Sequence, residues 1–187
     1  VDGTTPITST WTQVGSSNMW RTKLSADIWQ LFINWEEQVM ARWPNAKFSD
    51  DTIWDNDNYW AKGTIDDDEN AYTNGTIIDD PYTNSAGTAI DLNATGFDLD
   101  ETNKQAIAIL NLGSFKTWSR LVTSHSGNTF NYATVPTWKT KHHYYYLEGR
   151  KEFLDQEGEW WYDTYNNADS LYYYCLLYTS PSPRDPT

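Results

Sequence analysis

The segment from His143 to Tyr174 constrains the fold of this chain more than any other. It contains two β-prone runs, Glu159–Asp163 and Leu171–Tyr174, which are rich in tryptophan and tyrosine. Between them, Tyr165–Ser170 contains Asn, Asp and Ser, residues that favour turns. Two such runs around a turn predict an antiparallel hairpin. A hairpin with so many aromatic side chains cannot face water on both sides, so we expect it to close over a hydrophobic core.

The residues after this hairpin do not resemble a folding segment. Residues 175–185 read Cys-Leu-Leu-Tyr-Thr-Ser-Pro-Ser-Pro-Arg-Asp, and every one of them matches the translation of a common transposase sequencing adapter. We therefore expect residues 175–187 to be a non-native, adapter-derived tail and exclude them from fold reasoning. On this interpretation the chain is a truncated environmental open reading frame, and its single cysteine, Cys175, is not native.

Composition limits the classes of protein to which the chain can belong. Its 187 residues suffice for one domain with a real core. The 13 Lys+Arg against 26 Asp+Glu give a formal net charge of −13, which argues against nucleic acids and anionic membranes as partners. This acidity suits a protein that is secreted or held at the cell surface in salty water, where ions screen the repulsion. The aromatic content of 16% favours strands.

Alternating apolar residues predict several further strands. They are expected over Ile7–Val14, Met19–Leu24, Ile28–Ile33, Gln38–Trp43, Thr117–Thr123 and Thr129–Tyr132. The first two read as a hairpin with a four-residue loop. The run Gln105–Leu112 is the most apolar, and periodicity alone does not decide between a buried strand and a helix that begins at Glu101.

Between residues 46 and 100 the character of the sequence changes. This stretch is rich in Asp, Asn, Gly and Thr, with isolated hydrophobic residues. Short strands between long loops are suggested by Ile65, Ile77, Ile78, Ile90 and Leu92. A loop-rich excursion of this length inside a compact domain is usually functional or a lid. Its motif WDNDNYW, residues 54–60, fits either a short helix or an irregular loop.

Three stretches together resemble one family. The first is Asp2–Trp11, followed by a strand pair that leads into Ile28–Asn45 with its motifs Gln30–Ile33 and Ala41–Asn45. The second is Ala106–Tyr132, and the third is Tyr144–Tyr174. They are similar to the N-terminal region of right-handed parallel β-helix proteins of the bacterial carbohydrate-active type, in which a β-rich domain follows an early coil. Two departures stand out. Asn34-Trp35 replaces the usual Asp-Gly turn of that family, and Glu157 replaces its usual proline.

The resemblance implies an all-β fold, namely a β-sandwich-like accessory domain inserted in, or capping, a right-handed parallel β-helix of which only the edge is present. Residues 1–6 would end an early coil, and residues 7–174 would form the inserted β-rich domain with its acidic excursion at 46–100. A coil cannot bury its end alone, so solenoids carry such caps. The implied partners are a polysaccharide, bound through the parent protein, and the missing downstream β-helix of the same chain.

The implied function is that of a truncated, non-catalytic accessory domain of a secreted polysaccharide-active protein. The parent would be a glycoside hydrolase or a polysaccharide lyase, with its catalytic carboxylates on coils outside this chain. The alternative is a non-catalytic carbohydrate-binding or adhesive cell-surface β-protein. These two hypotheses differ in whether the whole protein cleaves its glycan, and a fold alone does not decide between them.

Trp54, Tyr59 and Trp60 are the candidate carbohydrate-binding residues. They lie in polar surroundings, and exposed aromatic rings stack on the faces of sugars. Loop aromatics also pack onto an underlying sheet, so both interpretations of these three residues stay open. Arg42, between Ala41 and Trp43, is interpreted as a structural ion-pair or cation–π partner.

No catalytic residue is predicted in this chain. Glu159 and Asp163 would share one face of a strand at a separation of about 13 Å, which is too far for a glycosidase pair. With Glu157 they are interpreted as turn and edge carboxylates of a structural hairpin.

No metal site or cofactor is predicted either. The acidic runs 66–69, 79–80 and 98–101 are open to structural calcium, but none has the spaced pattern of a calcium loop. A solvated acidic surface is therefore the favoured interpretation. His125, His142 and His143 lack ligand spacing with other donors.

Overall fold

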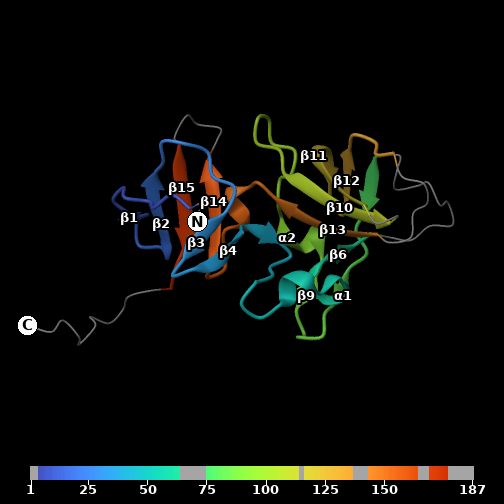
Figure 1. Ribbon diagram of the computed structural model, residues 1–187. Helices are drawn as coiled ribbons and strands as arrows, with labels where there is room; N and C mark the ends of the chain where they lie inside the picture. The colour runs from blue at the N-terminus through green and yellow to red at the C-terminus, as the bar shows by residue number, and fades with distance from the viewer. Residues whose placement is uncertain (1–3, 64–74, 114–115, 137–142, 164–168, 177–187) are drawn as a thin grey trace, which may run out of the picture.

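The computed structural model describes residues 4–63, 75–113, 116–136, 143–163 and 169–176, and it consists mainly of β-sheet. Two sheets of six and seven strands lie side by side, with short helices and a two-stranded ribbon below the larger one (Figure 1). The expectation of an all-β chain with sandwich-like sheets is confirmed. None of the described helices is long and apolar enough to cross a membrane.

The six-stranded sheet combines the two ends of the chain. Its strand order is β1-β2-β15-β14-β4-β3. The strands are β1 (Thr12–Gln13), β2 (Met19–Lys23), β3 (Leu31–Ile33), β4 (Glu36–Met40), β14 (Glu159–Asp163) and β15 (Ser170–Tyr174). The predicted hairpin at the end of the chain is therefore present, and it lies between β2 and β4. The strands expected over Ile7–Val14 and Ile28–Ile33 are shorter than predicted.

The seven-stranded sheet is formed by the middle of the chain. Its order is β5-β13-β10-β11-β12-β7, with β6 also paired to β13. The strands are β5 (Arg42–Trp43), β6 (Ala61–Lys62), β7 (Thr76–Ile78), β10 (Ile107–Gly113), β11 (Lys116–Ser126), β12 (Thr129–Tyr132) and β13 (Tyr144–Glu148). Because β10 is a strand, the alternative of a helix that begins at Glu101 is wrong.

Parallel pairing is confined to one short ladder among the described residues, where β4 pairs with β14 at Glu159↔Val39 and Trp160↔Met40. The other ladders of both sheets are antiparallel. A parallel β-helix coil stacks each strand in parallel on the next, so the described residues do not form one. The β-helix stays a proposal about a longer protein.

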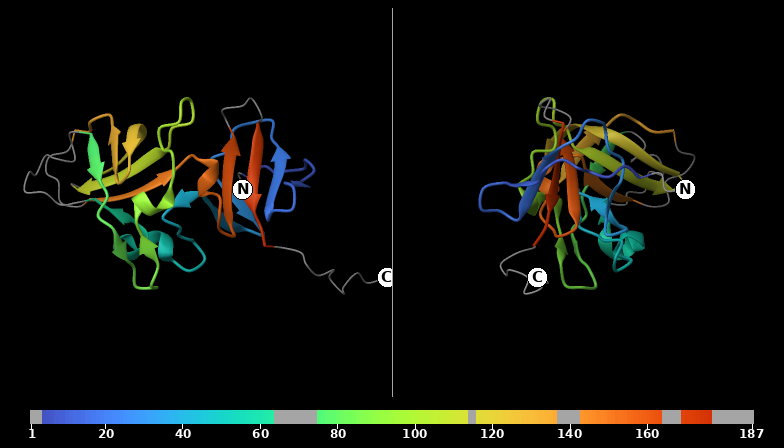
Figure 2. Two further views of the ribbon diagram at one scale, coloured as in Figure 1. Left: turned by 180° about the vertical axis from the view of Figure 1, so that it is seen from behind. Right: turned by 60° about the vertical axis from the view of Figure 1, so that its left-hand side comes forward.

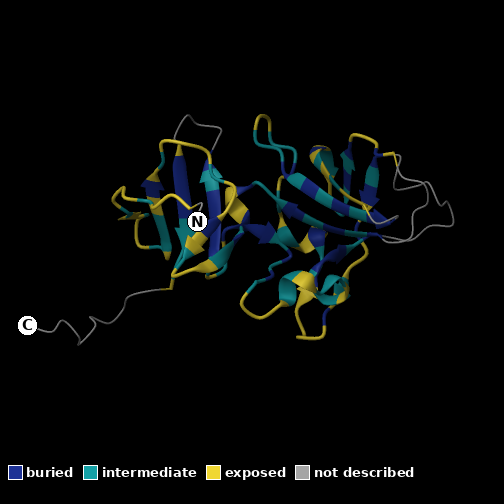
Figure 3. Cartoon of the chain, viewed as in Figure 1, coloured by how far each residue is buried: buried dark blue, intermediate teal, exposed yellow. Residues whose placement is uncertain are grey.

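The alternation of side chains gives the six-stranded sheet two apolar faces. Trp160, Leu171 and Leu31 form one buried cluster. On the other face, Trp161 and Tyr172 join the main core, which also contains residues of the seven-stranded sheet. Successive residues of a strand point to opposite faces, so the aromatic hairpin covers a core on each side, as its sequence predicts. Figure 3 shows the buried centre of each sheet.

The chain crosses between the sheets at Ala41. The sequence predicts a single strand over Gln38–Trp43, but the structure divides it into β4 in one sheet and β5 in the other. The Ala41 N–H donates to the Trp160 carbonyl at 2.7 Å. The next residue, Arg42, already pairs with Glu148 of β13.

Arg42 is buried at this crossing. Its guanidinium donates to the carbonyls of Pro44 (2.9 Å) and Tyr59 (3.0 Å) and lies 3.8 Å from the ring centre of Tyr146. The expectation of a structural cation–π partner is therefore confirmed. Burial lowers the pKa of Arg42 to about 10, against the opposing attraction of Tyr146 and Glu148.

The second crossing runs from β13 to β14 through a short helix, η3 (Lys151–Phe153) (Figure 2). Phe153 and Leu154 belong to the main core, which contains buried side chains of both sheets. Trp161 of β14 donates its indole N–H to the Gly149 carbonyl at 3.1 Å. The two sheets therefore share one hydrophobic core across this crossing.

Apart from β6 and β7, which belong to the seven-stranded sheet, the described residues of the segment 46–100 pack below that sheet (Figure 1). The segment contains η1 (Thr52–Trp54), α1 (Asn56–Tyr59), β8 (Tyr82–Thr83), β9 (Ala89–Ile90) and α2 (Leu92–Thr95), besides β6 and β7. Asp79 holds it in place, because its carboxylate accepts from the Tyr145 hydroxyl at 2.6 Å and the Leu92 N–H at 2.9 Å. Its described part is thus an integral layer of the domain and not a separate lid. Ile65 lies outside the described residues.

Leu92 was expected in a strand but begins the helix α2. The helix starts here because the Asp91 carboxylate accepts a hydrogen bond from the Ala94 N–H at 3.2 Å. It ends after one turn at Gly96, whose φ of 69° is the left-handed conformation of a helix stop. These two capping residues lie among many other Asp, Asn and Gly residues, so the sequence did not distinguish them.

Gly75 allows the segment to rejoin the sheet, which provides a test of this packing. A Cβ atom at Gly75 would lie 2.3 Å from the Tyr132 carbonyl oxygen. We expect Gly75→Ala to lower the free energy of unfolding by about 2–4 kcal/mol in urea titrations. Gly87→Ala is the matched control, since Gly87 also has a positive φ but open space around its Cβ position. Equal losses in the two variants would contradict the close approach at Tyr132.

Candidate functional site

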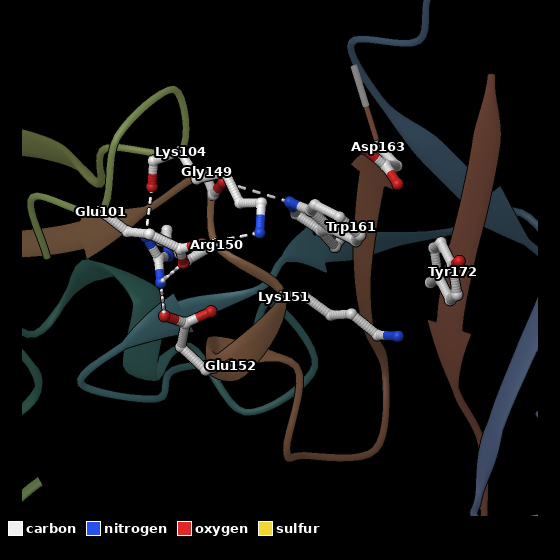
Figure 4. A pocket seen from close by; sticks show the side chains of 9 residues that line it. All are labelled: Glu101, Lys104, Gly149, Arg150, Lys151, Glu152, Trp161, Asp163 and Tyr172. Atoms are coloured by element: carbon white, nitrogen blue, oxygen red, sulfur yellow. Dashed lines mark hydrogen bonds and ion pairs between the residues drawn. The ribbon is translucent and has the colours of Figure 1, made fainter. Parts of the chain in front are cut away.

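A polar cleft of about 310 Å³ lies where η3 meets the hairpin of β14 and β15 (Figure 4). We call it the Arg150 cleft. It is lined by Glu101, Lys104, Gly149, Arg150, Lys151, Glu152, Trp161, Asp163 and Tyr172. These residues come from the segment before β10, from the connection between β13 and β14, and from the β14–β15 hairpin, so the fold brings together side chains that are distant in the sequence.

Arg150 is the central residue of the polar wall. It follows Gly149, whose φ of 84° turns the chain out of β13 and into η3. Only 6% of its side chain is exposed. Its guanidinium donates to the Lys104 carbonyl and forms ion pairs with Glu101 (3.1 Å) and Glu152. Figure 4 shows the guanidinium between these two carboxylates.

The opposite wall is aromatic. The rings of Trp161 and Tyr172 have their centres 5.4 Å apart and are tilted by 39°. The Lys151 ammonium lies 4.5 Å from the centre of the Tyr172 ring, a cation–π distance. In Figure 4 the Lys151 side chain extends from η3 toward Tyr172 and away from Arg150. The cleft therefore has a charged wall and an aromatic wall.

The electrostatics of the cleft do not suit glycoside hydrolysis. The hydrogen bond from Lys104 (2.7 Å) and the attraction of Arg150 lower the pKa of Glu101. Glu152 is ion-paired to the same guanidinium. A glycosidase general acid needs the opposite, a carboxyl group whose pKa is raised so that it carries a proton near neutral pH. These two glutamates are structural partners of Arg150, and the arrangement can hold a small polar ligand more readily than it can donate a proton.

Among the described residues, Glu159 is the carboxyl group whose pKa is raised most clearly, and it does not line the cleft. It is buried, and its Oε2 accepts from the N–H groups of Asp155 and Gln156, both at 3.1 Å. Burial raises its pKa to about 8, although these two hydrogen bonds oppose the shift. It closes the turn before β14, which agrees with a structural role for the hairpin carboxylates.

The aromatic residues predicted to bind carbohydrate do not form one surface. Trp54 is 71% exposed at the end of η1, where its ring lies 6.1 Å from that of Phe48. Tyr59 ends α1 and is half-buried. Trp60 is 8% exposed and packs edge-on against Tyr146 at 4.7 Å, so it presents no face to a ligand. For Trp60 the alternative of packing on the sheet is correct.

The acidic runs considered for calcium are also used structurally where they are described. Asp79 is buried against Tyr145, and Asp100 accepts the His125 N–H at 3.0 Å. Within the described residues, no group of three or more His, Cys, Asp or Glu side chains is placed to hold a metal ion. Residues 66–69 and His142 lie outside the described part of the chain. His143 is buried beside Gly63, whose N–H bonds to its carbonyl at 2.6 Å.

The Arg150 cleft was missed at the sequence level. Its local signal is the charged run Gly149-Arg150-Lys151-Glu152, which directly precedes the apolar Phe153 and Leu154. Such a run is usually a solvated surface. The partners that bury Arg150 lie in the segment before β10, about fifty residues earlier in the sequence. No periodicity connects the two segments.

Comparison with known proteins gives one informative likeness. A solved structure described as a glycoside hydrolase superposes with a TM-score of 0.57 at 17% sequence identity. The match covers 89% of this chain and 28% of that protein. The chain therefore has a fold found within a glycoside hydrolase and spans about a quarter of its length. No family model matches the sequence, and no curated protein matches it.

Glu159 makes the stability of the fold depend on pH. Its pKa rises from 4.5 to about 8 on folding, so its contribution to stability is complete below pH 4.5 and is lost as the pH rises through 8. We expect the free energy of unfolding to fall by a few kcal/mol between pH 5 and pH 8. In Glu159→Gln this decrease should be much smaller, whereas Glu157→Gln, at an exposed turn position, should follow the wild type. Urea titrations of the three proteins at both pH values measure this decrease. An equal decrease in the free energy of unfolding in all three would refute its assignment to Glu159.

Proposed function

We propose that this chain is a non-catalytic accessory β-domain of a larger, secreted polysaccharide-active protein of the glycoside hydrolase type. The observation that carries the proposal is the unequal coverage of the structural match, 89% of this chain against 28% of the hydrolase. A chain that matches about a quarter of such a protein would be one part of it. The fold alone does not determine activity, which depends on the residues of a particular site.

The chemistry of the Arg150 cleft supports the non-catalytic part of the proposal. Glycosidases use two carboxyl groups with different protonation, about 5–10 Å apart across the scissile bond. In the cleft, Glu101 and Glu152 are ion-paired to the same arginine, and Lys104 and this arginine lower the pKa of Glu101. Among the described residues, the carboxyl group with a pKa of about 8, Glu159, is buried in a structural turn. The catalytic pair would then belong to another part of the protein.

The partners of such a domain follow from the same proposal. The remaining part of the protein would be a right-handed parallel β-helix that this domain caps, as the motifs at Ala41–Asn45 and Leu154–Asp163 suggest. The glycan would be held by the whole protein. The strong negative charge argues against nucleic acids and anionic membranes as further partners. The second hypothesis, a carbohydrate-binding protein without catalysis, is favoured by exposed tryptophans that do not line the Arg150 cleft, namely Trp29, Trp35 and Trp54.

The proposal predicts that the chain alone does not cleave glycans. The full chain is incubated with xylan, β-glucan, arabinogalactan and pectin, and reducing ends and unsaturated uronates are measured. We expect no product above the buffer blank, because the described residues lack a proton-donor and nucleophile pair. Turnover that disappears in Asp163→Asn, the buried carboxylate of the cleft, would overturn the proposal and make the cleft an active site.

A further inference from the structure

The six-stranded sheet carries a second hollow, larger than the Arg150 cleft, with a volume of about 930 Å³. It is lined by residues 4–9 and 24–33, together with Trp11, Trp20, Trp35, Tyr173 and Cys175. We call it the tryptophan groove and define it by its aromatic residues, Trp11, Trp20, Trp29, Phe32, Trp35 and Tyr173. Tyr173 and Tyr172 are neighbours on β15, so the groove and the cleft lie on opposite faces of the sheet.

Two tryptophans of this groove are almost fully exposed. Trp29 is 86% and Trp35 is 81% accessible to solvent, and Phe32 between them is also exposed. Deeper in the groove, Trp11 and Tyr173 pack edge-to-face with their centres 6.4 Å apart. Exposed aromatic residues that gather in one hollow indicate a binding site, whereas apolar residues scattered singly over a surface do not.

Trp35 also has a backbone conformation that is unfavourable for a bulky residue. Asn34 and Trp35 connect β3 and β4 with φ values of 53° and 71°, and Ile33 pairs directly with Glu36. Two positive φ angles in a two-residue hairpin loop define a type I′ turn, whose second position normally holds glycine. A bulky residue there is strained, and an exposed ring gains little packing in return. The chain keeps tryptophan where folding favours glycine, which points to a contact with a ligand.

The charge of the groove narrows the class of ligand. Among the described residues that line the groove, Asp27 is the single charged one, and none is a lysine or an arginine. An anionic ligand would find no cation, and it would also meet a chain with a net charge of −13. The polar groups in its lining are uncharged hydroxyls and an amide, including those of Thr5, Ser25 and Gln30. Flat indole surfaces with scattered uncharged hydrogen-bonding groups complement a ligand that has apolar faces and many hydroxyls.

We propose that the tryptophan groove binds a neutral glycan chain. The axial C–H bonds of a pyranose ring form an apolar face that stacks on an indole, while its equatorial hydroxyls reach the rim of the groove. Trp29 and Trp35 stack on successive sugar rings, and the Ser25 hydroxyl and the Oε1 of Gln30 offer hydrogen bonds. A volume of about 930 Å³ admits a short oligosaccharide. This inference rests on the proposed function only for the choice of polysaccharide as the kind of ligand.

Binding is measured by isothermal titration of the full chain with cellohexaose, xylohexaose and laminarihexaose, and with oligogalacturonate as the anionic comparison. We expect at least one neutral oligosaccharide to bind with a Kd of about 0.1–1 mM and oligogalacturonate not to bind. Trp29→Ala and Trp35→Gly should each weaken this binding roughly tenfold. Trp35→Gly also places glycine at the type I′ turn, so it should keep or raise the Tm. Loss of binding in this variant is therefore separated from loss of folding.

Leu121→Ala is the matched control, because Leu121 is an exposed apolar residue of β11 outside the groove. Its affinity should equal that of the wild type. The inference is overturned if no neutral oligosaccharide binds at about 5 mM, if oligogalacturonate binds equally well, or if Leu121→Ala or Trp54→Ala weakens binding as much as Trp29→Ala. A concentration-dependent dimer that Trp29→Ala dissociates would assign the groove to a second copy of the chain. A chain that neither binds nor hydrolyses glycans overturns this inference but leaves the proposed non-catalytic role standing.

Discussion

The burial of one guanidinium, that of Arg42, is the constraint on which the arrangement of the two sheets depends. Removing this charge from water is costly, and the cost is offset by the carbonyls of Pro44 and Tyr59 and by the face of Tyr146. These partners all follow the crossing, directly after β5, at the end of α1 and within β13. Ala41, next to Arg42, bonds to Trp160 in the other sheet. The position of each sheet is therefore coupled to the satisfaction of this one cation.

Arg150 holds the second crossing in a similar way. It bonds to the segment before β10, while its neighbour Lys151 reaches the hairpin of the other sheet. Two arginines thus mark the two places where the chain passes from one sheet to the other. The same crossings leave the hairpin of β14 and β15 with two usable faces. One face contributes Trp161 and Tyr172 to the Arg150 cleft, and the other contributes Tyr173 to the tryptophan groove.

The sequence predicted those features whose cause is local. The hairpin of Glu159 to Tyr174 follows from its two runs of aromatic residues and its Asn/Asp turn, and β12 follows from its alternating apolar residues. The division of the predicted strand at Ala41 depends on Trp160 and Tyr146, more than a hundred residues away. Both candidate sites likewise combine residues that are distant in the sequence. Trp60 shows the limit clearly, because its polar neighbours in sequence predict exposure whereas Tyr146 buries it.

The position of the β14–β15 hairpin has a consequence for how the domain assembles. β2 pairs with β15 at Lys23↔Ser170, and β4 pairs with β14 at Val39↔Glu159. β2 and β4 do not touch each other in the strand order, so the centre of this sheet is missing until the hairpin arrives. Contacts between residues so distant in sequence form late, since closing long loops costs entropy before any contact forms. During synthesis, Leu31 and Trp11 therefore stay uncovered until the hairpin is made and completes the sheet.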